Sequence, residues 1–155
     1  FRSRGLGDVY KRQASDMPMI EADVGRVRQI MHNLLRNSVE ALEGADNGLI
    51  EVDVDSMEVH DVVVVEIVVA DNGPGFKADS LSQVFDPYVT TKPKGTGLGL
   101  AIVKKLVEEH AGTIEAENRA KGGALIRIQL PINEIARGQM IAKLPGRAEQ
   151  RRERA

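Results

Sequence analysis

The chain contains no cysteine and no tryptophan, and only 3% of its 155 residues are aromatic. The missing cysteines exclude disulfides and thiol chemistry, and the shortage of aromatic rings excludes a base-stacking platform for nucleic acid. The longest apolar run, residues 62–70, is interrupted by Glu66 and is far shorter than the ~20 residues that a membrane helix needs. With a formal net charge of −2, the chain also has no overall basic field. We therefore expect one domain with an aliphatic core, no nucleic-acid partner and no direct membrane contact.

Hydrophobic periodicity predicts an α+β fold. Apolar residues at helical spacing predict helices over residues 24–42, with Asp23 as N-cap, and over residues 97–110. Alternating or β-branched runs predict a short edge strand and four main strands, over residues 17–20, 49–59, 62–70, 113–118 and 124–130. This order of elements is typical of a two-layer α/β sandwich, with helices on one face of a mixed, mainly antiparallel sheet.

Both ends of the chain fall outside the predicted domain, which we place at residues 16–132. Residues 1–13 show no periodicity and resemble translated adapter sequence. We interpret them as a non-native or disordered leader, and we expect the natural protein to continue upstream. Residues 133–155 are polar with an Arg-rich end, which predicts a charged tail that is helical or disordered.

Asn33 and Asn37 are one helical turn apart, so their side chains share one face of the first predicted helix. Asparagine offers a neutral oxygen, and magnesium takes oxygen ligands while keeping phosphates and waters in its shell. The pair is therefore a candidate magnesium site. On spacing alone, a solvated helix face without any ligand is the favoured explanation.

Asp71 follows the apolar run and begins the loop Asp71-Asn72-Gly73-Pro74-Gly75. An ionised aspartate only accepts hydrogen bonds, so it suits the exocyclic amine of adenine and disfavours the carbonyl of guanine. Gly73 and Gly75 would let a flat base approach the backbone. A plain Asp-Asn-Gly turn remains the alternative.

The stretch Gly95-Thr96-Gly97-Leu98-Gly99-Leu100 opens the second predicted helix. Backbone N–H groups at a helix start bind phosphates, and Lys92 and Lys94 precede the stretch. The spacing fits neither a dinucleotide-binding fingerprint nor a Walker A loop. A flexible glycine linker is the alternative.

Together, in this order, these motifs and Phe85-Asp86-Pro87-Tyr88 resemble the catalytic and ATP-binding domain of bacterial sensor histidine kinases, over residues 16–132. The matching positions are that family's N box (Asn33, Asn37), G1 box (Asp71, Gly73, Gly75), F box (Phe85, Pro87) and G2 box (Gly95, Gly97, Gly99). Residues 88–94 look most like nitrogen-regulation sensor kinases. The resemblance implies the Bergerat ATP-binding fold, which gyrase, MutL and Hsp90 share.

The resemblance also implies the ligand and the residues that hold it. It implies that Mg-ATP binds, that Asn37, with Asn33 as a second candidate, holds magnesium through side-chain oxygen, and that Asn33, Asn37 and Lys92 act in catalysis. The implied ATP contacts are Asn33, Asn37, Asp71, Gly73, Gly75, Phe85, Thr91, Lys92, Lys94, Gly95, Thr96, Gly97, Leu98, Gly99 and Leu100.

The implied reaction is phosphoryl transfer to a protein. The related ATPases carry a glutamate general base four residues before the magnesium-binding asparagine, and Asn33 stands there in this chain. The resemblance therefore implies that the γ-phosphoryl group goes to a histidine on a missing dimerisation domain and then to a response regulator. His32, His60 and His110 do not fit that acceptor. We expect a monomeric, cytoplasmic domain whose parent protein is a candidate for inner-membrane anchoring.

Three other functions stay open at this point. They are a gyrase–MutL–Hsp90-type ATPase, an anti-sigma-type serine kinase, and a nucleotide-sensing scaffold that transfers nothing. Leu125 falls where many relatives have a threonine near the adenine, so that contact is in doubt. Steady hydrolysis would favour the ATPase, and tight ATP binding without phospho-histidine would favour the scaffold.

Overall fold

The structure, a computed structural model, describes residues 9–13, 17–90 and 95–143. Its elements are β1 (Val9–Gln13), α1 (Val24–Ala41), β2 (Ile50–Val59), β3 (Val62–Asp71), the 3-10 turn η1 (Leu81–Gln83), α2 (Gly99–Glu109), β4 (Thr113–Asn118), β5 (Ala124–Pro131) and α3 (Glu134–Lys143). The strands form one sheet in the order β1-β2-β3-β5-β4. β1 pairs parallel with β2, and the other neighbours pair antiparallel.

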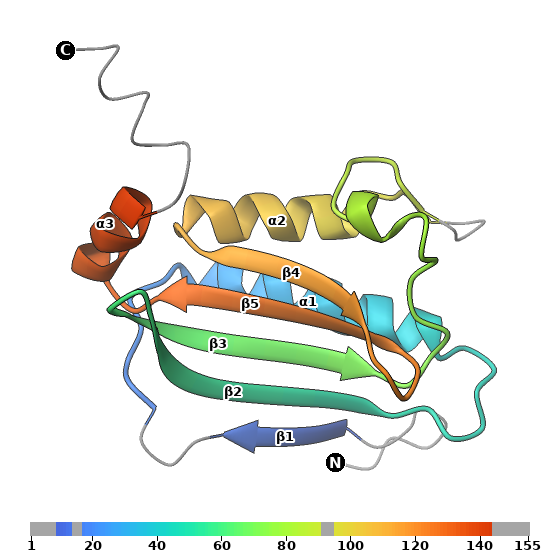
Figure 1. Cartoon of the computed structure of the whole chain (residues 1–155). Coiled ribbons are helices and arrows are strands. Elements are labelled where there is room, and N and C mark those ends of the chain that lie inside the picture. The colour runs from blue at the N-terminus through green and yellow to red at the C-terminus, as the bar shows by residue number, and fades with distance from the viewer. Residues whose placement is uncertain (1–8, 14–16, 91–94, 144–155) are drawn as a thin grey trace.

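Helices α1 and α2 lie side by side on one face of the sheet (Figure 1). α1 starts where predicted, because the Asp23 carboxylate accepts a hydrogen bond from the Arg26 amide at 3.0 Å. Its buried face consists of Ile30, Leu34 and Ser38. The predicted α+β sandwich is confirmed, with two helices over a mainly antiparallel sheet.

The main core lies between these helices and the sheet. It consists of aliphatic side chains from both layers: Ile30, Leu34, Leu42, Ile50, Val52, Val65, Ile67, Val69, Val103, Leu106, Val107, Ile126, Ile128 and Leu130. On the central strand β3, the residues at 65, 67 and 69 share the core face because side chains alternate along a strand. The continuous apolar run of β3 reflects cover on both faces at its start, because Val62 and Val64 are buried on the side away from α1 and α2.

The opposite face of the sheet is charged over β3, β4 and β5. Arg127 on β5 lies 3.6 Å from a carboxylate oxygen of Glu66, 3.9 Å from Glu115 and 3.7 Å from Glu117. These residues alternate with the core positions, so their side chains point away from α1 and α2. The exposed face of the sheet is therefore stabilised by charge pairing.

α3 covers a second, smaller apolar cluster at the start of β3. Val62 and Val64 are fully buried there against Ala136 and Met140. Residues 134–143 of the polar C-terminal segment are thus helical, and residues 144–155 lie outside the described part of the chain. No helix in the described ranges combines the length and apolarity needed to cross a bilayer.

The sheet edge next to β2 differs from the prediction. Met17–Ile20 is not a strand, and the next residue, Glu21, donates its amide to the Ile132 carbonyl at 2.8 Å. Pro18 has no N–H to donate to a ladder. Instead, Val9–Gln13, which we assigned to the leader outside the domain, pairs with β2. An open strand edge accepts any extended segment through backbone groups alone, so sequence pattern gave no signal for this pairing.

Candidate functional site

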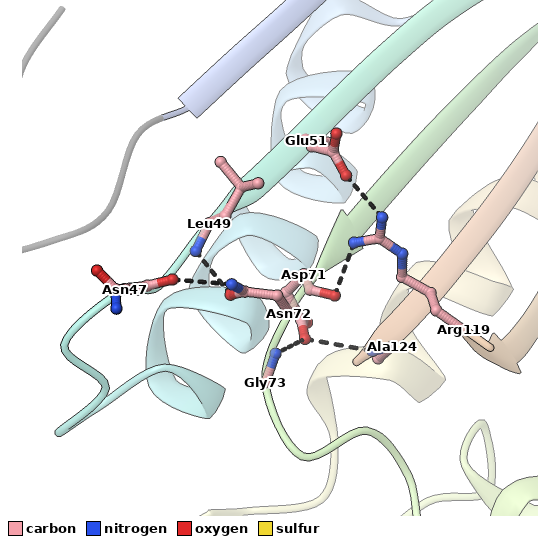
Figure 2. A network of polar contacts seen from close by, with 8 residues as sticks. All are labelled: Asn47, Leu49, Glu51, Asp71, Asn72, Gly73, Arg119 and Ala124. Carbon is pink, nitrogen blue, oxygen red and sulfur yellow. Dashed lines mark hydrogen bonds and ion pairs between the residues drawn. The ribbon is translucent and has the colours of Figure 1, made fainter. Parts of the chain in front are cut away.

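Asp71, the last residue of β3, is buried with 4% of its surface exposed. Its Oδ1 accepts hydrogen bonds from the amides of Gly73 at 2.9 Å and Ala124 at 3.2 Å (Figure 2). Within the described residues, no donor reaches Oδ2. The carboxylate is therefore fixed through one oxygen, and the other can accept a hydrogen bond from a ligand.

The loop that follows Asp71 is held at both ends by side-chain amides. Asn72 accepts from the Leu49 amide at 2.7 Å and donates to the Asn47 carbonyl at 2.8 Å, which ties the loop to the α1–β2 connection (Figure 2). Asn118, at the end of β4, accepts from the Phe76 amide at 2.7 Å and donates to its carbonyl at 2.8 Å. Gly73 and Gly75 lie between these two clamps, so the backbone they present is fixed in place.

Asn33 and Asn37 are half-buried on α1. The amide oxygen and nitrogen of Asn37 lie 3.7 and 3.8 Å from the point where a Cβ would stand at Gly99. The second asparagine of the pair is thus brought against the first residue of α2, as a shared site requires. The absence of a side chain at Gly99 leaves the space between them open.

The glycine-rich stretch leads into α2 as predicted, but the helix begins at Gly99 and not at Gly97. Gly97 has φ +68°, and a Cβ there would lie 2.5 Å from the backbone carbon of Tyr88. Tyr88 donates its amide to the Gly97 carbonyl at 2.9 Å. Leu98, the N-cap residue, makes no side-chain cap bond, so the first amides of α2 can bind an anion.

The remaining predicted contacts divide into two groups. Gly95 and Thr96 are exposed, while Leu98 and Leu100 are half-buried at the start of α2. Phe85 is half-buried and packs against the main core. Thr91, Lys92 and Lys94 lie outside the described residues.

The sheet register shows where Leu125 lies relative to Asp71. Leu125 pairs with Ala70, one residue before Asp71, so its side chain alternates to the face opposite the Asp71 carboxylate. Ala124 is the residue whose backbone contacts Asp71. The register gives a physical reason for the doubt about an adenine contact at Leu125, because its side chain does not share a face with the Asp71 carboxylate.

Of the three histidines, only His110 is buried. Its Nδ1 lies 2.7 Å from the Leu106 carbonyl, which can only accept, so this nitrogen carries the proton. His110 thus closes the last turn of α2. His32 and His60 are exposed.

The described residues offer only part of the ligand shell that a hard cation needs. Among the described residues, no three His, Asp or Glu side chains gather to hold a metal ion. Asn37, and Asn33 one turn before it, offer neutral oxygens, which suit magnesium when phosphate oxygens complete its shell.

The sequence singled out Asp71 and its glycines but missed Asn72, Asn118 and Arg119. The last two come from the β4–β5 hairpin, more than 40 residues from Asp71. Only the strand pairing of β3 with β5 brings them to the site. These two residues could have been found only from a prediction of the strand order in the sheet.

Comparison with known proteins identifies a family that matches most of the chain. Residues 22–134 match the family described as histidine kinase-, DNA gyrase B- and HSP90-like ATPases. The sensor histidine kinase ZraS of Klebsiella oxytoca is 45% identical over 131 residues, which is 84% of this chain and 27% of that protein. An NtrY-like sensor histidine kinase of Rickettsia bellii is 42% identical over 113 residues, 73% of this chain and 18% of that protein. The chain therefore spans well under a third of these relatives.

Solved structures agree with the sequence comparison. The nucleotide-free catalytic domain of histidine kinase ThkA superposes with a TM-score of 0.71 at 31% identity, covering 84% of this chain and 82% of that one. Full-length ShkA in complex with AMPPNP gives a TM-score of 0.68 at 31% identity, covering 82% of this chain and 26% of that one. At this identity and coverage, the likeness extends to nearly the whole described domain.

Proposed function

Because the chain belongs to the family of histidine kinase-, DNA gyrase B- and HSP90-like ATPases, we propose that it binds Mg-ATP as the catalytic domain of a sensor histidine kinase. The observation that carries this proposal is the state of Asp71. The residue is buried, two backbone amides hold its Oδ1, and its Oδ2 has no donor among the described residues. A carboxylate oxygen at this nearly buried residue, without a protein donor among the described residues, is available to accept a hydrogen bond from a ligand.

The exocyclic amine of adenine is the donor that Oδ2 would accept. Guanine presents a carbonyl at the same place, and two acceptors facing each other repel. The clamps at Asn72 and Asn118 fix the loop backbone against which the base would lie. We infer that the site selects ATP over GTP through this one contact, because a buried polar group left without its partner is costly.

The phosphates would lie between α1 and the start of α2. The uncapped amides of α2 supply donors and the positive end of the helix dipole. Asn37, which faces Gly99, and Asn33 would hold magnesium, with Asn33, Asn37 and Lys92 as the catalytic groups and Thr91 and Lys94 as further contacts. Magnesium, when bound, neutralises charge on the transferring phosphoryl group. These residues then act by positioning, which is the main contribution of protein to this chemistry.

The acceptor belongs to another part of the parent protein. Asn33 supplies an amide and no base where related ATPases place a glutamate, so an attacking water would not be activated. The γ-phosphoryl group would pass to a histidine on a dimerisation domain and then to a response regulator. The relatives support this reading, since they are named sensor histidine kinases and extend well beyond the matched region.

The test is calorimetric titration of the chain with ATP and GTP, each with and without magnesium. We expect magnesium-dependent ATP binding and no GTP binding. Asp71→Asn replaces an acceptor oxygen with an amide, and we expect ATP affinity to fall at least about tenfold. Asp61→Asn is the matched control, because Asp61 is 91% exposed at the far end of β3. If Asp71→Asn remains folded and binds ATP like the control, the adenine assignment is wrong.

A measurement of phosphate release distinguishes a kinase domain from an ATPase. We expect negligible release from the chain alone, and acid-labile phospho-histidine after addition of a separately produced acceptor domain. Steady hydrolysis would instead favour an ATPase of the same family. ATP binding without any transfer would favour a nucleotide-sensing scaffold.

A further inference from the structure

Arg119, which follows β4, links three strands at the end of the sheet where Asp71 lies. Its Nη1 donates to the Asp71 backbone carbonyl at 3.1 Å, and its Nη2 donates to Glu51 Oε2 on β2 at 2.8 Å (Figure 2). Its side chain is 24% exposed and that of Glu51 is 35% exposed. One guanidinium thus reaches from the β4–β5 hairpin across the end of β3 to β2.

The main-chain carbonyl of Asp71 lies beyond the paired part of β5, because the register of β3 with β5 ends at Ala70–Leu125. Arg119 supplies a donor for this carbonyl at the point where the ladder to β5 stops. The same hairpin supplies the Ala124 amide for the Asp71 carboxylate. Asp71 is therefore held at its backbone and at its side chain by one hairpin.

The turn of this hairpin is closed around Arg119 itself. The Arg119 amide donates to the Gly123 carbonyl at 2.9 Å, and the Gly122 amide donates to the Arg119 carbonyl at 3.0 Å. The backbone of Arg119 is therefore fixed relative to the turn that leads directly to Ala124. Because Glu51 holds the other arm of the guanidinium, the hairpin is fixed relative to β2 as well as β3.

We propose that Arg119 is a positioning residue for adenine recognition: it fixes the Asp71 carboxylate at the place where the exocyclic amine binds. The inference rests on the proposed function, because it needs Asp71 to contact adenine. Arg119 itself touches no nucleotide in this proposal. Its planar fork makes both bonds at once, which a lysine ammonium on a flexible stem reproduces poorly.

The test compares ATP with purine riboside triphosphate, which has the same ribose and phosphates but lacks the exocyclic amine. For wild type we expect ATP to bind more tightly than the analogue. Arg119→Met should weaken ATP about tenfold, the worth of one charge-assisted hydrogen bond, and leave the analogue nearly unchanged. The ratio of the two affinities therefore falls. A merely structural role would weaken both nucleotides equally and leave the ratio as in wild type.

Arg127→Met is the matched control. Arg127 is 32% exposed on the neighbouring strand and pairs with Glu66, Glu115 and Glu117, away from Asp71. We expect the affinity ratio of this variant to equal that of wild type. A ratio that falls equally in both variants overturns the proposal, because loss of any arginine on this face would then suffice.

The outcomes separate this inference from the proposed function. If wild type binds no ATP, or binds ATP and the analogue equally, the adenine assignment fails and the role of Arg119 fails with it. If wild type discriminates and Arg119→Met keeps the full ratio, only the role of Arg119 is overturned. If Arg119→Met does not fold, the same comparison is made with Arg119→Lys. We expect its ratio of ATP affinity to analogue affinity to be at least about twofold below that of wild type. An unchanged ratio would overturn the proposal.

Discussion

Substitution of Gly123 by alanine tests how closely the β4–β5 turn must approach Asp71. Its φ is +102°, and a Cβ at this position would lie 1.9 Å from the Asp71 carbonyl oxygen and 2.7 Å from the carbonyl carbon. Gly122 provides an internal comparison, since its φ is +94° and a Cβ there would meet nothing within 4 Å. The two alanine variants share backbone strain and differ in the clash.

The magnitudes follow from this difference. Gly122→Ala should destabilise the domain by about 1–2 kcal/mol, the cost of a left-handed conformation for a residue with a Cβ. Gly123→Ala carries the same strain, and to bring the 1.9 Å approach to an ordinary contact of 3.4 Å its turn must also move by about 1.5 Å. That movement breaks the 3.2 Å bond from the Ala124 amide to the Asp71 carboxylate. Losing a hydrogen bond to a charged group adds about 1.5–3 kcal/mol, so we expect a total of roughly 3–5 kcal/mol.

Urea denaturation followed by circular dichroism gives both free energies of unfolding. ATP titration below the unfolding transition then shows whether the nucleotide site is damaged beyond the loss of stability. We expect Gly122→Ala to bind like wild type and Gly123→Ala to bind more weakly. Equal free energies of unfolding for the two variants, together with unchanged ATP affinity in Gly123→Ala, would refute the argument from close approach.

Two further predictions concern side-chain contacts. Asp23→Ala removes the N-cap of α1 and should lower the free energy of unfolding by about 1 kcal/mol in urea denaturation without changing ATP affinity; an undiminished free energy would show that the bond to the Arg26 amide contributes nothing. Asn118→Ala leaves the amide and carbonyl of Phe76 without their partner and should weaken ATP binding by about 1 kcal/mol in calorimetry, whereas an unchanged affinity would mean that the loop after Asp71 keeps its shape without this clamp.

Local patterns predicted the parts of the fold that local chemistry determines. The cap at Asp23 and the helical spacing of Val27, Met31 and Leu34 were sufficient for α1, and the apolar run was sufficient for a central β3. The start of α2 was placed at Gly97, two residues early, because the contact that keeps Gly97 out of the helix comes from Tyr88 and is not local. The edge strand β1 was missed for a similar reason, since backbone pairing needs no side-chain pattern.

In the candidate site too, features set by local sequence could be predicted and features set by distant contacts could not. Asp71, its loop glycines and Asn37 could be predicted because each belongs to a compact motif, and the structure brings Asn37 against Gly99. Arg119 and Asn118 could not, because neither has a distinctive neighbour in sequence. The bond from the Ala124 amide to Asp71 could not be predicted either, because a shift of one residue exchanges the two faces of a strand. Register is a property of the assembled sheet, so a single sequence indicates it least directly.

The hydrogen bond from the Ala124 amide to Asp71 also has a consequence for folding during synthesis. These residues are 53 positions apart, so a chain emerging from the ribosome presents Asn37, Asp71 and the start of α2 well before the β4–β5 hairpin exists. Contacts of such long range form late, because the loop between them must first be closed. Nucleotide affinity should therefore arise only when synthesis has passed the hairpin. From then on, ATP would stabilise the folded domain by mass action. Only a chain that has formed the hairpin would gain this stability.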